Sequence, residues 1–234
     1  MMRALLIAVA FALVHAASAA HSQEPVQVIR FTDYRAGSVE GWLREKGFDI
    51  EQDAKNRAAI ELIPGGNGLT VKTRRRAFGI LPNEQVNLSD FTFVEIDWAV
   101  NRHPAGASYE KGVRNEAIMV IVFMGDERQP SGSMFIPDSP YFVGLFVCSG
   151  DDRTNHPYVG AYFKKSGRYV CLDRPEPGKL VTTRFNLLDA YHAYFDKDRK
   201  EDPGISGIAL SVDTKKGEQG GAAEALVREI RFYR

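Results

Sequence analysis

Residues 91–101 read FTFVEIDWAVN, and their side chains alternate in character with a period of two. Successive residues of a β-strand point to opposite sides of a sheet, so this alternation predicts a strand. One face is largely apolar and consists of Thr92, Val94, Ile96, Trp98 and Val100. The other face carries Glu95 and Asp97, roughly 7 Å apart along a strand. The stretch therefore predicts a strand with one face in a core and the other facing either water or a ligand.

Short segments of similar character, separated by turn residues, predict further strands. They cover residues 26–31, 58–66, 68–78, 116–125, 141–148, 156–164, 168–173, 180–187, 205–213 and 226–233. The run 116–125 is apolar on both faces, which is typical of a central strand covered on both sides. One short helix is predicted near residues 187–200, where apolar residues recur at helical spacing. We therefore predict an all-β chain folded as an antiparallel two-sheet β-sandwich of the jelly-roll type.

The N-terminus has the parts of a secretory signal peptide. Arg3 supplies a positive start, residues 4–14 form an apolar run too short for a comfortable membrane span, and residues 17–19 read Ala-Ser-Ala. We predict a signal peptide over residues 1–20, a flexible lead-in over 21–25 and a single β-sandwich domain over 26–234. No later run is apolar enough to span a bilayer. The expected location is the periplasm or the outside of the cell.

The chain has 30 basic and 30 acidic residues, a balance that does not favour nucleic acid as a partner. Its two cysteines, Cys148 and Cys171, each lie in or at the end of a predicted strand. In an exported protein such a pair is expected to form a disulfide. The bond would close a loop of about 23 residues and contribute about 3 kcal/mol. The alternative is two buried thiols that only pack.

Several segments together resemble a family of exported bacterial proteins of unknown function with a galactose-binding-like jelly roll of the carbohydrate-module type. They read FTFVEIDWAVNRHPAGA (91–107), NEAIMVIVF (115–123), RFNLLDAYHAYF (184–195), GIALSVDTKKG (207–217) and EIRFYR (229–234). The resemblance implies export, a jelly-roll fold and a carbohydrate ligand.

The segment AYFKKSGRY, residues 161–169, resembles the YFKxGxY strand of jelly-roll alginate lyases. That resemblance implies catalysis by Tyr162 or Tyr169, with Arg74 and Lys164 neutralising a uronate carboxylate. The central strand reads MVIVFMG and has no His or Gln to complete such a site. The sequence therefore favours a binding protein over an enzyme.

The polar faces of three predicted strands supply the candidate ligand-binding residues. They are Arg74, Arg76, Glu95, Asp97, His156, Tyr158, Tyr162 and Lys164. Aromatic rings stack on the apolar faces of sugars and cations pair with carboxylates or sulfates, so the set suits a neutral or acidic glycan. The same residues could instead form cross-strand ion pairs on a face that meets water.

No cofactor or catalytic metal is predicted. Oxygen-rich loops that contain Asp151, Asp152, Asp213 and Glu218 could hold a structural calcium ion. Three functions follow from these observations. The first is a non-catalytic protein that binds envelope or exported polysaccharide, the second is a lyase acting on an acidic glycan, and the third is a structural or interaction protein of the envelope, whose protein partner the sequence does not identify.

Overall fold

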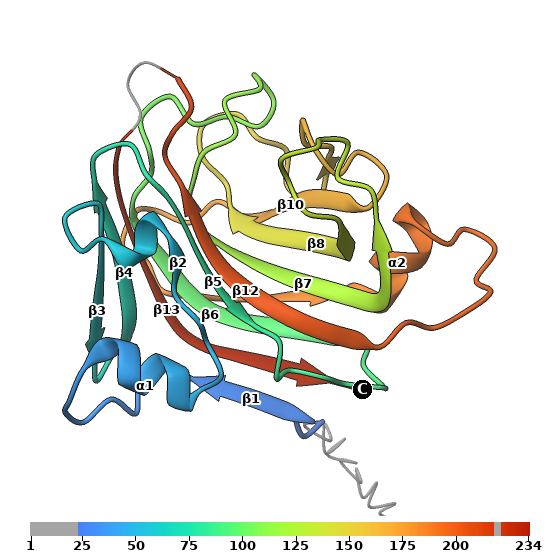
Figure 1. Cartoon of the computed structure of the whole chain (residues 1–234), viewed down its shortest axis with the longest axis horizontal. Helices are drawn as coiled ribbons and strands as arrows, with labels where there is room; N and C mark the ends of the chain where they lie inside the picture. Colours follow the sequence, from blue (N-terminus) through green and yellow to red (C-terminus); the bar gives the residue numbers. More distant parts are fainter. Residues whose placement is uncertain (1–22, 218–220) are drawn as a thin grey trace, which may run out of the picture.

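The computed structural model describes residues 23–217 and 221–234, which form two facing sheets (Figure 1). Sheet A has the strand order β11-β6-β13-β4-β3, and β1 also pairs with β13. Its strands are β1 (Gln27–Arg30), β3 (Ile60–Gly65), β4 (Gly68–Arg74), β6 (Phe93–Arg102), β11 (Val181–Asn186) and β13 (Ala222–Tyr233). Sheet B has the order β2-β5-β12-β7-β8-β10-β9. Its strands are β2 (Glu51–Gln52), β5 (Phe78–Asn83), β7 (Glu116–Gln129), β8 (Ser139–Val147), β9 (Pro157–Tyr158), β10 (Gly167–Asp173) and β12 (Ile205–Asp213).

The predicted all-β sandwich is confirmed. One detail differs: β10 runs parallel to β8, whereas the other strand pairs are antiparallel in the described residues. A parallel neighbour requires a crossover connection, and residues 148–166 supply it. The crossover ends at Gly167, where β10 begins.

Strand β6 lies between β11 and β13 and has the two faces that its alternation predicts. Val94, Ile96, Trp98 and Val100 are buried in the core shared by the two sheets. From the opposite side β7 contributes Ile118, Val120, Val122 and Met124 to the same core. Burial of these side chains is the main source of stability, at about 1.5–3 kcal/mol for each large one.

The predicted strand 68–78 is in fact two strands in different sheets. Strand β4 ends at Arg74, and β5 begins at Phe78 in sheet B. Two hydrogen bonds hold the bend between them. The guanidinium of Arg76 donates to the carbonyl of Lys215, and the amide of Ala77 donates to Thr214 Oγ1 at 3.0 Å. Arg74, Arg75 and Arg76 are all exposed, so the alternation of buried and exposed side chains stops at the bend and resumes at Ala77.

The predicted strand 156–164 is wrong for most of its length, because only Pro157 and Tyr158 pair, with β10. Tyr158 is buried rather than on an open polar face. Phe163 has a φ of 53°, in the left-handed region, which lies outside the extended conformation of a regular strand. Residues 159–166 therefore pack as a loop.

Two α-helices occur in the described residues (Figure 1). Helix α2 (Leu187–Tyr194) confirms the predicted helix but ends earlier. Asn186 caps its N-terminus, because the Asn186 side chain accepts from the amide of Asp189. Helix α1 (Val39–Glu45) is not among the elements that the sequence predicts. Ser38 caps it, and Trp42 packs edge-on against Phe31. A 3₁₀ turn, η1 (Asp53–Lys55), precedes β3.

Cys148 and Cys171 form the predicted disulfide, with their Cα atoms 5.2 Å apart. It joins the end of β8 to β10 across two strands that already pair. The predicted signal peptide, residues 1–20, lies outside the described residues, as do residues 21 and 22 of the lead-in. No helix in the described part of the chain is long and apolar enough to cross a bilayer.

Candidate functional site

Glu95 and Asp97 lie on the outer face of sheet A, where Arg231 of β13 binds both. The guanidinium donates to the two carboxylate oxygens of Asp97 at 2.8 and 2.9 Å and to Glu95 at 3.3 Å. Tyr233 donates to Glu95 at 2.8 Å, and Thr182 donates to Asp97 at 2.6 Å. Burial opposes the charge of Asp97, but the hydrogen bonds from Arg231 and Thr182 outweigh it and lower the pKa of this carboxyl below its ordinary value. These two carboxylates are thus engaged in a cross-strand ion-pair network.

The remaining candidate residues are divided between the two sheets. Arg74 lies on β4 of sheet A, 3.4 Å from Glu61, and Arg76 lies in the bend after it. The other four lie at one edge of sheet B, around β9. His156 precedes this strand, Tyr158 belongs to it, and Tyr162 and Lys164 follow it. The structure therefore does not bring the eight residues together on one sheet face. Their role in ligand binding stays a prediction.

The lyase residues are divided in the same way, because Arg74 lies in sheet A and Tyr169 in sheet B. Burial, together with the charge of Glu116, raises the pKa of Tyr169 well above its ordinary value. A phenol with a raised pKa ionises less readily, so less phenolate is present near neutral pH to act as a base. Tyr162 is 47% exposed in the loop before β10.

The outer face of sheet B is apolar, unlike that of sheet A. Strand register places one row of side chains across it, formed by Pro82, Ala209, Ile121, Gly144 and Tyr169. Glycine is required in this surface because a Cβ at Gly144 would lie 2.5 Å from Met119 Sδ, and one at Gly167 would lie 2.4 Å from the Phe142 ring. The absence of a side chain at these two glycines leaves room for Met119, Tyr169 and Phe142 to pack against the sheet.

A groove of about 390 Å³ opens at one end of this face, a volume in the range of small-molecule sites. We call it the sheet B groove; it is lined by Pro82, Asn83, Glu84, Phe123, Asp126, Arg128, Ser139, Pro140, Ser206, Gly207 and Ile208. The half-buried ring of Phe123 is its one aromatic lining residue. Glu84, Asp126 and Arg128 are exposed around it. The Arg128 guanidinium is held by the carbonyl of Asp138 at 2.9 Å, and Ser206 donates to the carbonyl of Gly125 at 2.7 Å.

Sequence reasoning missed these groove residues. The predicted strand ends at residue 125, whereas β7 continues to Gln129 and carries Asp126 and Arg128 beyond the apolar run. The signal that could have found the site is the outward half of the apolar run, Met119, Ile121 and Phe123, since a strand apolar on both faces needs a cover on each. A second hollow of about 390 Å³ lies beside α1 and includes Tyr34, but that phenol donates to the carbonyl of Gly37.

The other end of the sheet B face is closed by Tyr109. Its ring stacks on Phe146 with centroids 4.3 Å apart, and its hydroxyl donates to Glu116 at 2.8 Å. Glu116 is 7% exposed and lies opposite Asp213 of β12. Burial raises the pKa of both carboxyls, and the nearby Asp213 raises that of Glu116 further. This end is a covered acidic pair rather than an open site.

Glu116→Gln is expected to remove a pH dependence of stability. The folded pKa of Glu116 lies above the unfolded value near 4.5, so the folded chain holds the proton more tightly and wild-type stability falls as the pH rises above that value. Gln still accepts from Tyr109 but never ionises. We expect an unfolding temperature a few degrees above wild type at pH 8, with the two converging near pH 5.

Calorimetry between pH 5 and 9 measures this difference. Glu127→Gln, an exposed residue of the same strand, is the matched control and should follow the wild-type curve. Parallel curves for wild type and Glu116→Gln would contradict this prediction, because they would show that ionisation of Glu116 does not lower the stability of the folded protein.

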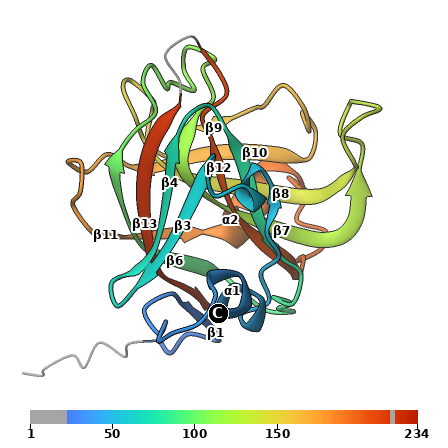
Figure 2. The ribbon, with the colours of Figure 1, turned by 60° about the vertical axis from the view of Figure 1, so that its left-hand side comes forward.

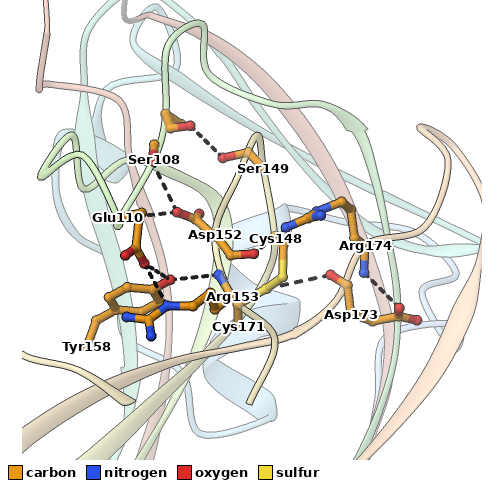
Figure 3. The surroundings of a disulfide bond; sticks show 11 residues. Ser108, Glu110, Cys148, Ser149, Asp152, Arg153, Tyr158, Cys171, Asp173 and Arg174 are labelled. Carbon is orange, nitrogen blue, oxygen red and sulfur yellow. Dashed lines mark hydrogen bonds and ion pairs between the residues drawn. A yellow bond between two sulfur atoms is a disulfide. The ribbon is translucent and has the colours of Figure 1, made fainter. Parts of the chain in front are cut away.

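Loops 103–115 and 148–158 are tied together beside the disulfide (Figure 3). Tyr158 and Arg153 donate to Glu110 at 2.9 and 3.0 Å, and the buried carboxylate of Asp152 accepts from the amide of Glu110 at 3.1 Å. Asp151 accepts from Ser108 and pairs with Lys111. Within residues 23–217 and 221–234 no group of three or more His, Cys, Asp or Glu is placed to hold a metal ion. Glu218 lies outside the described residues, and calcium binding stays a prediction.

No protein-family model and no curated protein matches the chain. Several solved structures are similar. A carbohydrate-binding module specific for non-crystalline cellulose, CBM28, is 12% identical, covers 81% of this chain and 88% of its own, and gives a TM-score of 0.35. The exoplasmic/lumenal domain of VIP36, bound to Ca²⁺ and mannose, is 11% identical over 80% and 82%, with a TM-score of 0.38. Endoglucanase 3 of Trichoderma harzianum, from family GH12, is 9% identical over 84% and 99%, with a TM-score of 0.37. At these identities and TM-scores the likenesses carry no argument about ligand or activity.

Proposed function

We propose that this protein is a non-catalytic carbohydrate-binding protein and that the sheet B groove is its ligand site. The observation that carries the proposal is the placement of one aromatic ring, Phe123, in a groove with three exposed charged residues around it. An aromatic ring offers an apolar surface to the C–H face of a sugar. The carboxylates of Glu84 and Asp126 can accept from hydroxyl groups, and Arg128 can donate to them.

The arrangement favours binding over catalysis. Glu84 and Asp126 are exposed, whereas a general acid in glycoside hydrolysis needs an environment that keeps it protonated. The carboxyls whose pKa is raised are Glu116, which accepts from Tyr109, and the partly buried Asp213 opposite it, and both lie outside the groove lining. The ligand we propose is a polysaccharide of the envelope or an exported one.

We also propose that the protein is exported. The disulfide between Cys148 and Cys171 supports this, because such bonds persist in oxidising compartments. Fractionation of cells that express the full chain tests it, and recovery of the protein in the cytosol with both thiols reduced would contradict it.

Phe123→Ala is expected to weaken glycan binding at least about tenfold, which corresponds to about 1.4 kcal/mol, because it removes the stacking surface. Isothermal titration of the purified protein against neutral and uronic acid oligosaccharides measures the affinity. Absorbance of unsaturated products is followed in the same samples. The expected result for the wild type is saturable binding without product.

Tyr162→Ala is the matched comparison, since Tyr162 is an exposed aromatic residue outside the groove lining. It should bind like the wild type. Loss of binding with Tyr162→Ala but not with Phe123→Ala would move the site to the loop before β10. Product formation would favour the lyase, and no binding to any glycan would favour an interaction protein.

A further inference from the structure

Exposed apolar side chains gather beside the loop that joins β7 to β8. Of the seven large apolar residues exposed in the described part of the chain, four lie in residues 134–135 and 159–162: Met134, Phe135, Val159 and Tyr162. Met134 is 95% exposed and Phe135 is 91% exposed. Single exposed apolar residues need no explanation. Two adjacent apolar side chains that are almost fully exposed form a contiguous apolar surface, and such surfaces mark interaction sites.

The loop holds these side chains in a defined position. Ser131 is buried, and its hydroxyl donates to the carbonyls of Ile136 at 2.6 Å and Ser133 at 3.0 Å, while its amide donates to Asp138 at 3.0 Å. Its carbonyl accepts from the amide of Phe163 at 2.8 Å, which ties the loop to the segment before β10. Figure 2 shows the β7–β8 loop standing out from the body of the sheet, on the right-hand side. The exposed pair thus lies at the end of an anchored projection.

Positive charge lies next to this projection. Lys164 and Lys165 directly follow Phe163 and are both exposed. The carboxylates of the hairpin lie toward its base: Asp126 and Glu127 are on β7, and Asp138 is turned toward the amide of Ser131. Because the amide of Phe163 donates to the carbonyl of Ser131, the two lysines follow a residue that is bound to the base of the loop that carries the apolar tip.

We propose that Met134 and Phe135 insert into an anionic lipid surface, with Lys164 and Lys165 contacting the headgroups. An apolar tip alone binds a bilayer weakly, and a basic patch beside it supplies the second attraction that peripheral binding requires. A projecting tip can enter a fluid interface without a shaped partner, whereas a protein partner of stable affinity needs a broad complementary face. Met134 and Phe135 are not part of the lining of the sheet B groove, to which the base of the same hairpin contributes Asp126, Arg128, Ser139 and Pro140.

Sedimentation with vesicles tests the proposal, using phosphatidylcholine vesicles with and without phosphatidylglycerol. We expect the wild type to bind the vesicles that contain phosphatidylglycerol, and Met134→Ser/Phe135→Ser to bind them at least about tenfold more weakly. Lys164→Gln/Lys165→Gln should also bind more weakly, and high salt should weaken the wild type. Ile63→Ser, which alters a 42% exposed apolar residue on β3, is the control and should bind like the wild type.

Three results would overturn the proposal. They are a wild type that binds neither vesicle, a Met134→Ser/Phe135→Ser variant that binds as well as the wild type, and a lipid-free dimer in ultracentrifugation that this variant abolishes. The last result would assign the tip to a second copy of the chain. The glycan titration distinguishes these failures from a failure of the groove, because the tip variant leaves Phe123 unchanged.

Discussion

The double variant Cys148→Ala/Cys171→Ala is expected to lose about 3 kcal/mol of unfolding free energy. The disulfide closes a loop with a sequence separation of 23, and opening a loop of that length gives the unfolded chain back its conformational entropy. For a chain of this size the loss corresponds to a fall in unfolding temperature of roughly 6–12 °C. Urea denaturation of the purified protein measures it.

The loss should be larger than that from any single contact of the disulfide surroundings. Arg153→Gln is the control, because it breaks an ion pair to Glu110 in which the arginine side chain is 59% exposed. Such an exposed pair is screened by solvent and contributes little to stability. Equal stability of the cysteine variant and the wild type would mean that the strand pairing of β8 with β10 already restricts this segment. Limited proteolysis should cut loops 103–115 and 148–158 first in the cysteine variant.

The sequence was sufficient for the features that depend on local alternation. Strand β6, the two-sheet sandwich and helix α2 follow from side-chain periodicity, because a face that alternates must be buried against another layer. Periodicity does not encode which sheet a strand joins. The bend at Arg75 and Arg76 moves the chain from sheet A to sheet B, and the three exposed arginines there do not say which sheet the next strand joins. The parallel pairing of β10 with β8 is equally invisible, because it depends on a crossover and not on local pattern.

The candidate site was harder to predict than the fold for the same reason. Glu95 and Asp97 can be placed on an outward face from the sequence, but Arg231, which binds them, is 134 residues from Asp97 along the chain. The sheet B groove likewise gathers residues from β5, β7, β8 and β12. Only the register between strands brings these side chains together, and register is set by tertiary packing.

Arg231→Met is expected to cost about 2–3 kcal/mol of stability at neutral pH. The arginine side chain is 17% exposed, and its removal leaves the similarly enclosed carboxylate of Asp97 without its cation. Glu95 and Glu229 each lose one ion pair and keep a longer one, to Arg184 at 3.6 Å and to Arg30 at 3.3 Å. Arg74→Met is the control, since its side chain is 74% exposed and forms one long contact with Glu61, so its cost should stay below about 1 kcal/mol.

The pH dependence separates an ion-pair network from simple packing. The folded pKa of Asp97 is lowered, so this carboxylate contributes stability above its unfolded value near 3.8 and loses that contribution as the pH falls through the folded pKa. Without Arg231 the lowering disappears, and the difference between variant and wild type should shrink toward pH 3. Asp97→Asn combined with Arg231→Met should recover part of the loss, because one of the repelling charges is removed. If Arg231→Met instead leaves stability unchanged at every pH and abolishes glycan binding, the outer face of sheet A is the ligand surface, and Glu95 and Asp97 bind the glycan.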